Sequence, residues 1–265
     1  MSRIFKALQQ ESWLILPERL EMMHQIASRE YDVEMLAAKV GQPLDNTRKV
    51  EIRGTTAIIP VIGSIYRYAN LFTEICGDVS TEVLIQDIVK AGENPRVKEI
   101  VMIYDTGGGQ AAGIWEATKI MEDVRRVKPI IAYVDDMAAS GGYWLSSSSD
   151  HIAASKTAMV GSIGAVYGFS FKKDSGVETI EIVSRVSPKK RPDIRTDAGK
   201  EQIQVWADRL GETFVQGVAD NRGVTFDEVL ANFGQGDLLI AEDALRAGMI
   251  DEITTFEALL KSIQS

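Results

Sequence analysis

The sequence predicts an α/β fold built around a mostly parallel sheet. Apolar runs of strand length alternate with longer amphipathic stretches of helix length through the middle of the chain. Glycine-rich turns follow two of these runs, at the points where a chain would leave a sheet. The chain has 265 residues and is 45% hydrophobic, which is enough for a sizeable core. Such an alternation indicates right-handed βαβ units.

The first 50 residues are predicted to form a helical arm and a linker ahead of the main domain, which covers 51–265. Residues 16–41 carry leucine, methionine and isoleucine at spacings of three and four. Pro17 suits a first helical turn and Gly41 suits a helix end. The polar stretch "QPLDNTRKVEIRG" at 42–54 is typical of a linker.

The main domain opens with the alternating pattern and continues with shorter elements. Several runs after residue 150 are typical of short strands, and a basic loop, "SPKKRPDIR", precedes a long amphipathic helix. Predicted strands are 55–63, 97–105, 128–136, 151–155, 158–169 and 177–184, and predicted helices are 80–94, 109–127, 197–221, 225–233 and 241–248.

Composition excludes several classes of function. The net charge of -9 argues against a nucleic-acid surface, which needs concentrated lysine and arginine. Cys76 is the single cysteine, so an internal disulfide or a cysteine-based metal cluster cannot form. Apolar runs are far shorter than the ~20 residues of a membrane span, and the N-terminus lacks a secretory signal pattern. We therefore expect a cytoplasmic protein without an integral membrane segment.

The stretch "DMAASGGYW" places Ser140 between two alanines and two glycines, directly after a predicted strand. Small neighbours allow another backbone to approach closely, which suits a nucleophile that must meet a peptide. The alternative is structural, because serine is also a common N-cap of a helix. The residues alone leave both interpretations open.

A second small-residue cluster, "DTGGGQAAG", also follows a strand and opens a helix. Its backbone N–H groups could bind an anion. However, the sixth position of a dinucleotide motif counted from Gly107 is Ala112, and Gly113 is followed by Ile114 instead of the Lys of a P-loop. An oxyanion-stabilising turn and a plain strand-to-helix corner remain.

A serine nucleophile needs a neighbouring base. Both histidines are unsuitable: His24 lies in the predicted arm, and His151 follows Ser140 too closely. A lysine is the alternative, provided that its pKa falls from about 10.4 so that the amine is neutral. Lys189 and Lys190 lie side by side next to Arg191, although such a run is also typical of a solvated loop.

The block "DMAASGGYWLSSSSDHIAASKTAMVGSIGAVYG", with "VMIYDTGGG" upstream, resembles the signal peptide peptidase A family of Ser-Lys peptidases, especially its phage and prophage head-maturation branch. The resemblance covers about residues 55–253. It implies Ser140 as nucleophile and Lys190 as general base, since the phage-type "SPxKRPD" loop matches 187–193. Lys189 is the alternative base, because the two lysines are adjacent.

The resemblance also implies the remaining site residues. Backbone N–H groups of Gly141 and of Gly109, with Gly108, would form the oxyanion hole, although Gly107 stands where the family usually has proline. Ser162, in the "GSIG" segment, would orient the lysine. This chemistry needs no cofactor and no metal.

The same family implies a Clp-protease/crotonase-like spiral of βαβ units, a homo-oligomer, and a protein or peptide substrate. In the phage branch the substrates would be scaffold and capsid precursors. Three alternatives remain: general signal-peptide-peptidase-like degradation, a crotonase-like acyl-CoA enzyme on the same scaffold, and a non-catalytic assembly protein.

Overall fold

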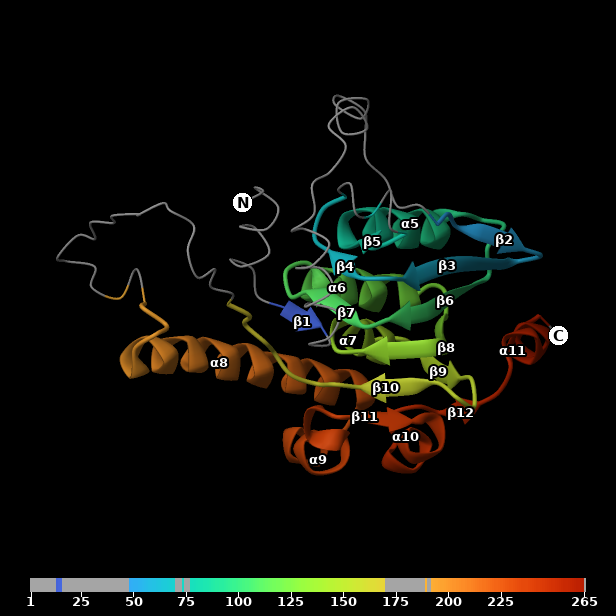
Figure 1. Ribbon diagram of the computed structural model, residues 1–265. Coiled ribbons are helices and arrows are strands. Elements are labelled where there is room, and N and C mark those ends of the chain that lie inside the picture. Colours follow the sequence, from blue (N-terminus) through green and yellow to red (C-terminus); the bar gives the residue numbers. More distant parts are fainter. Residues whose placement is uncertain are drawn as a thin grey trace, which may run out of the picture.

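The computed structural model describes residues 13–15, 48–69, 73, 77–169, 189 and 192–264. These residues form the expected α/β fold, in which helices pack on a mainly parallel sheet (Figure 1). Of the predicted N-terminal arm, residues 13–15 form a short strand, and the predicted helix at 16–41 lies outside the described residues.

The main sheet has the strand order β11-β10-β8-β6-β3-β2, with β9 on β8 and β12 on β9. The pairs β3–β6, β6–β8, β8–β9, β8–β10 and β9–β12 are parallel, whereas β2 and β11 join their neighbours antiparallel. The strands are β2 (Glu51–Arg53), β3 (Thr56–Ile62), β6 (Glu99–Thr106), β8 (Ile130–Ala139), β9 (His151–Ala154), β10 (Met159–Gly161), β11 (Leu238–Ile240) and β12 (Glu252–Ile253).

A second, smaller sheet lies beside the carboxyl ends of the main strands. Its order is β1-β7-β4-β5, with β1 antiparallel to β7 and the other pairs parallel. The strands are β1 (Trp13–Ile15), β4 (Ile65–Tyr66), β5 (Val79–Ser80) and β7 (Gly108–Gln110).

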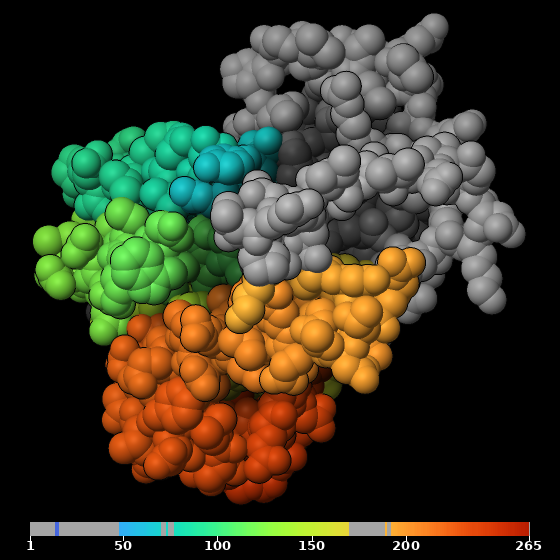
Figure 2. All heavy atoms as spheres, turned by 90° about the vertical axis from the view of Figure 1, so that its left-hand side faces the viewer, coloured from blue at the N-terminus to red at the C-terminus, as the bar shows by residue number. Residues whose placement is uncertain are grey.

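The helices connect and cover these strands. They are α5 (Thr81–Glu93), α6 (Ile114–Arg125), α7 (Gly141–Ser147), α8 (Asp197–Arg222), α9 (Phe226–Asn232), α10 (Ala241–Ala247) and α11 (Phe256–Ile263). Figure 2 shows teal, green and orange segments, which contain α5, α6 and α8, following one another from top to bottom. None of the helices among the described residues combines the length and apolar character that a membrane crossing requires.

Each face of the main sheet packs into a different hydrophobic core. Ile59, Met102 and Ala132 belong to the large cluster that includes residues of α5, α6, α7 and α8. Their neighbours Ile58, Val101 and Ile131 belong to a smaller cluster with Leu259 and Leu260 of α11. Successive side chains of a strand point to opposite faces, so the continuously apolar strands become buried on both sides.

The structure confirms most predicted elements and corrects three boundaries. The strand predicted at 158–169 is limited to β10, residues 159–161, and the stretch predicted as a linker contains β2. The strand predicted at 177–184 lies outside the described residues. The helix predicted at 109–127 begins only at Ile114, because residues 108–110 form β7. Gly108 and Gly113 have φ values of 94° and 93°, so the chain turns twice before the helix starts. These left-handed angles favour glycine, and they allow a strand to fit between β6 and α6.

Polar contacts join the C-terminal segment to α7 and α8. The Tyr143 hydroxyl donates to the Met249 carbonyl at 2.9 Å, and Arg222 donates to the Gly248 carbonyl and to Asp251 at 2.6 Å. Burial alone would raise the pKa of Asp251. Hydrogen bonds from Arg222 and from the Ile152 N–H outweigh this effect and lower the pKa.

Replacing Arg222 by methionine should lower the free energy of unfolding by about 2–3 kcal/mol at pH 7, since the Arg222 side chain is only 11% exposed and Asp251 would lose its charged partner. The pKa of Asp251 is lower in the folded protein than in the unfolded chain. The stabilisation from its charged carboxylate is therefore fully present above the pKa of the unfolded chain, and it is lost as the pH falls through the pKa of the folded protein. Urea unfolding of both proteins between pH 7 and pH 3 tests this. A stability difference that stays constant into acid would contradict it.

Candidate active site

Ser140 lies at the carboxyl end of β8, at the first residue before α7. Its backbone has φ 52° and ψ -123°, a conformation that costs a residue with a side chain of order 1–3 kcal/mol. Its N–H donates to the Gly161 carbonyl at 2.8 Å, and its carbonyl accepts from Trp144. The side chain makes no N-cap hydrogen bond. Ser140 therefore occupies the N-cap position of α7 with a strained backbone, but its side chain does not cap the helix. Its role as nucleophile stays a prediction.

The small residues around Ser140 are required by close contacts. A Cβ on Gly142 would overlap Cγ2 of Thr106, and a Cβ on Gly141 would lie 3.3 Å from Cδ1 of Ile114. The alanines before Ser140 are completely buried in β8. The "AASGG" pattern is thus explained by packing on both sides of the turn.

The glycine turn at 107–109 lies next to Ser140, because β6 and β8 are adjacent parallel strands. The backbone nitrogen of Gly141 is 3.0 Å from the position that a Cβ would take on Gly108. On Gly109 a Cβ would coincide with the Ile65 backbone. The three glycines predicted for the oxyanion hole therefore lie close together at the carboxyl ends of the strands, where ligands of α/β proteins usually bind.

Thr106 holds this turn in place, and sequence reasoning missed it. Its hydroxyl donates to the Gly63 carbonyl at 2.5 Å and accepts from the Gly108 N–H at 3.1 Å. Thr106 is 2% exposed and pairs with Ala138 across a shift of register in the sheet. The sequence signal that could have predicted this role is the position of Thr106 directly between a strand and three glycines.

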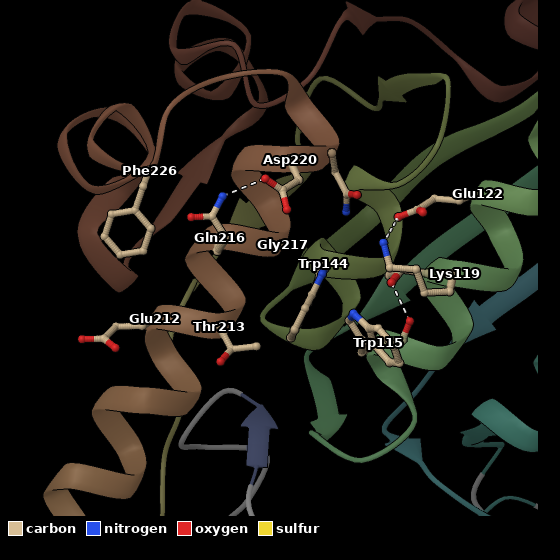
Figure 3. A pocket seen from close by; sticks show the side chains of 12 residues that line it. Trp115, Lys119, Glu122, Trp144, Glu212, Thr213, Gln216, Gly217, Asp220 and Phe226 are labelled. Carbon is tan, nitrogen blue, oxygen red and sulfur yellow. Dashed lines mark hydrogen bonds and ion pairs between the residues drawn. The ribbon is translucent and has the colours of Figure 1, made fainter.

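Helix α8 packs against α7, the helix that begins directly after Ser140. Trp144 stacks on Phe214, with ring centroids 4.9 Å apart, and Asn221 donates to the Ser147 hydroxyl at 2.9 Å. A Cβ on Gly217 would overlap the Trp144 ring, so the helices cross closely there. Figure 3 shows Trp144 and Gly217 facing each other on these elements.

A hollow of about 470 Å³ lies between α6 and α8. Figure 3 shows the side chains that line it. Trp115, which is 55% exposed, and Lys119 form one wall, and Thr213 and Gln216 form the other. Ser140 is not among the residues that line this hollow.

Ser162 lies close to Ser140 through the backbone. It follows Gly161, whose carbonyl accepts from the Ser140 N–H, and it has a φ of 52° itself. Its own N–H donates to the Asp237 carbonyl at 2.8 Å. The predicted lysine-orienting serine is therefore close to Ser140 in space, although its action on a lysine stays a prediction.

Of the two lysines predicted as candidates for the general base, the structure describes only Lys189. Lys190 lies outside the described residues. Lys189 is exposed, and its carbonyl accepts from Gln202 of α8 at 2.7 Å. It lines a hollow of about 700 Å³ together with Pro192 and Trp206. Within the described part of the chain, no hydrogen bond or ion pair joins Lys189 to Ser140, so the base remains a prediction.

Comparison of the sequence with known proteins identifies the family of this chain. The family model described as peptidase family S49 matches residues 122–265, which is more than half of the chain. The chain belongs to peptidase family S49. The match includes Ser140 and Ser162, and the upstream glycine turn precedes it.

Similar curated proteins include several named proteases. "Protease 4" of Haemophilus influenzae is 30% identical over 83% of this chain and 36% of its own length. "Capsid assembly protease C" of Escherichia phage lambda is 28% identical over 78% of this chain and 48% of its own. "Putative protease MJ0651" of Methanocaldococcus jannaschii is 29% identical over 68% of this chain and 59% of its own. The S49 chain thus spans well under two thirds of each relative.

Membership of family S49 confirms the predicted resemblance and the Clp-protease/crotonase-like fold. It also favours a peptidase over the acyl-CoA alternative, because the similar proteins carry protease names. The relatives include phage proteins and signal-peptide-peptidase-like proteins at comparable identity, so they do not separate the two branches.

Proposed function

We propose that this S49 chain is a serine endopeptidase with a Ser140–Lys190 dyad. The observation that carries the proposal is the left-handed backbone of Ser140 at the end of β8, beside the glycine turn of β7. A serine that only capped a helix would not need such a conformation, because N-cap residues normally lie in the extended region. The strain is consistent with a hydroxyl presented for reaction.

The proposed reaction has two stages. The Ser140 Oγ attacks the carbonyl carbon of a substrate peptide while the neutral amine of Lys190 takes its proton. N–H groups of Gly109 and Gly141, with Gly108 shaping the turn, stabilise the resulting oxyanion. Lys190 returns the proton to the leaving amine, and a water molecule then hydrolyses the acyl-enzyme with Lys190 again as base. Ser162 is proposed to orient the lysine amine.

We propose scaffold and capsid precursors as the substrates. The similarity to "Capsid assembly protease C" and to "Head-tail preconnector protein GP5" of Enterobacteria phage P21 supports this choice. General degradation of proteins and peptides is the alternative, since "Putative signal peptide peptidase SppA" of Enterococcus faecium is 26% identical over 74% of the chain. The homo-oligomer expected from the resemblance stays a prediction.

The experiment is labelling of the full chain with a fluorophosphonate, which reacts only with activated serines. We expect stoichiometric labelling of the native protein at Ser140 and none of the Ser140→Ala variant. Ser146→Ala is a matched control, because the Ser146 hydroxyl is buried and donates to the Tyr143 carbonyl at 3.0 Å. Equal labelling of native protein and Ser140→Ala would refute the proposal. Absence of labelling after prolonged incubation, both in the native protein and in a variant that releases β1, would favour a non-catalytic assembly role.

A further inference from the structure

The short strand β1 brings a distant part of the chain onto the glycine turn. Leu14 is opposite Gly109, and Ile15 is opposite Gly108, in an antiparallel pair. On its other side β7 pairs with β4, where Ile65 is opposite Gly109. Residues 13–15 therefore occupy the edge of β7 that would otherwise be open, as Figure 1 shows for β1 beside β7. An extended peptide commonly binds an open sheet edge in this way.

The carbonyl group of Leu14 lies against the glycines assigned to the oxyanion hole. A Cβ on Gly108 would collide with the Leu14 carbonyl oxygen, and a Cβ on Gly141 would be 3.3 Å from the same atom. In a serine peptidase the oxyanion hole receives the carbonyl oxygen of the residue before the cleaved bond. The Leu14 carbonyl oxygen thus lies against the two glycine residues beside which a substrate carbonyl would have to bind.

The side chains of Leu14 and Ile15 are buried. Leu14 is 0% exposed and belongs to the large core cluster, which includes Ile65 and Ile114. Ile15, on the other side of the Leu14–Ile15 bond, is 3% exposed. Both sides of the bond are therefore paired with β7 and buried, so a cleaved amine would remain in place and could re-form the bond.

We propose that residues 13–15 are an internal ligand of the substrate groove and hold the enzyme inactive until they leave it. The inference rests on the proposed peptidase function. Because the segment belongs to the same chain, it competes with a free substrate at a high effective concentration. The groove that it fills would accept an extended peptide with an aliphatic residue in the place of Leu14.

The test measures the rate of fluorophosphonate labelling of Ser140 in full-length variants. Leu14→Asp would place a carboxylate in an apolar site and should release the segment. We expect labelling at least about tenfold faster than in the native chain, because the open fraction limits the native rate. Leu14→Ala should change the rate in the same direction by less, without a buried charge. Leu245→Asp, at a side chain of α10 that is 39% exposed, is the matched control and should not change it.

A peptide added in trans provides a second measurement. The octapeptide ESWLILPE, residues 11–18, should slow the labelling of Leu14→Asp back toward the native rate, and the same peptide with Asp for Leu should not. Equal labelling rates of native, Leu14→Ala and Leu14→Asp chains would overturn this inference and leave the peptidase proposal intact. Recovery of a native chain that begins at Ile15 would also overturn it, because the segment would then be a substrate that is removed. Absence of labelling in every variant would overturn the peptidase proposal and the inference with it.

Discussion

Replacing Lys190 by alanine is expected to abolish peptide cleavage, with a fall in kcat/KM of about 10⁴-fold or more. Without a neutral amine beside it, the Ser140 hydroxyl keeps its proton and is a weak nucleophile. The measurement is kcat/KM on an unstructured protein or peptide substrate. The free energy of unfolding should change little, since the effect concerns proton transfer and not packing.

Lys189→Ala is the matched control for this prediction, because it removes the same side chain one residue away. Lys189 is exposed, and the contact that the structure gives it uses its backbone carbonyl, which alanine retains. Most of the activity should therefore remain. If Lys189→Ala is inactive and Lys190→Ala is active, Lys189 is the base, and if both remain active the Ser-Lys dyad is wrong.

A methyl group on Gly109 is expected to have the second large effect, on folding and activity together. In Gly109→Ala the new Cβ would coincide with backbone atoms of Ile65, which cannot move aside as a flexible side chain can. Forcing β7 away from β4 should lower the free energy of unfolding by about 3 kcal/mol or more. It should also displace an N–H of the proposed oxyanion hole, and the loss of one such donor typically costs a factor of about 10²–10³ in kcat.

Gly211→Ala is the control for the Gly109 variant. Gly211 lies inside α8, and a Cβ there meets nothing within 4 Å. Alanine should stabilise this helix by about 0.5–1 kcal/mol and leave cleavage unchanged. Urea unfolding and kcat/KM of the two variants are the measurements. Native-like stability of Gly109→Ala would show that β7 can shift away from β4, and the predicted oxyanion geometry would then be wrong.

Local patterns were sufficient for most of the fold. Strands β3, β6 and β8 and helices α5 and α8 follow from runs of apolar residues and from amphipathic spacing, which depend on neighbours in sequence. The short strands β1, β4, β5 and β7 could not be predicted in the same way. Each has two or three residues, and its conformation is set by a partner strand far away in the chain.

The features of the candidate site also divide into those that depend on local sequence and those that depend on distant contacts. From the sequence we could predict candidate residues for the chemistry: a serine among small residues, a glycine turn after a parallel strand, and a pair of lysines before a long helix. Only the tertiary structure decided the left-handed backbone of Ser140, the support of Gly108 by Thr106, and the approach of Leu14 to both glycines. These features depend on contacts between residues distant in sequence, and local propensity contains no information about such contacts.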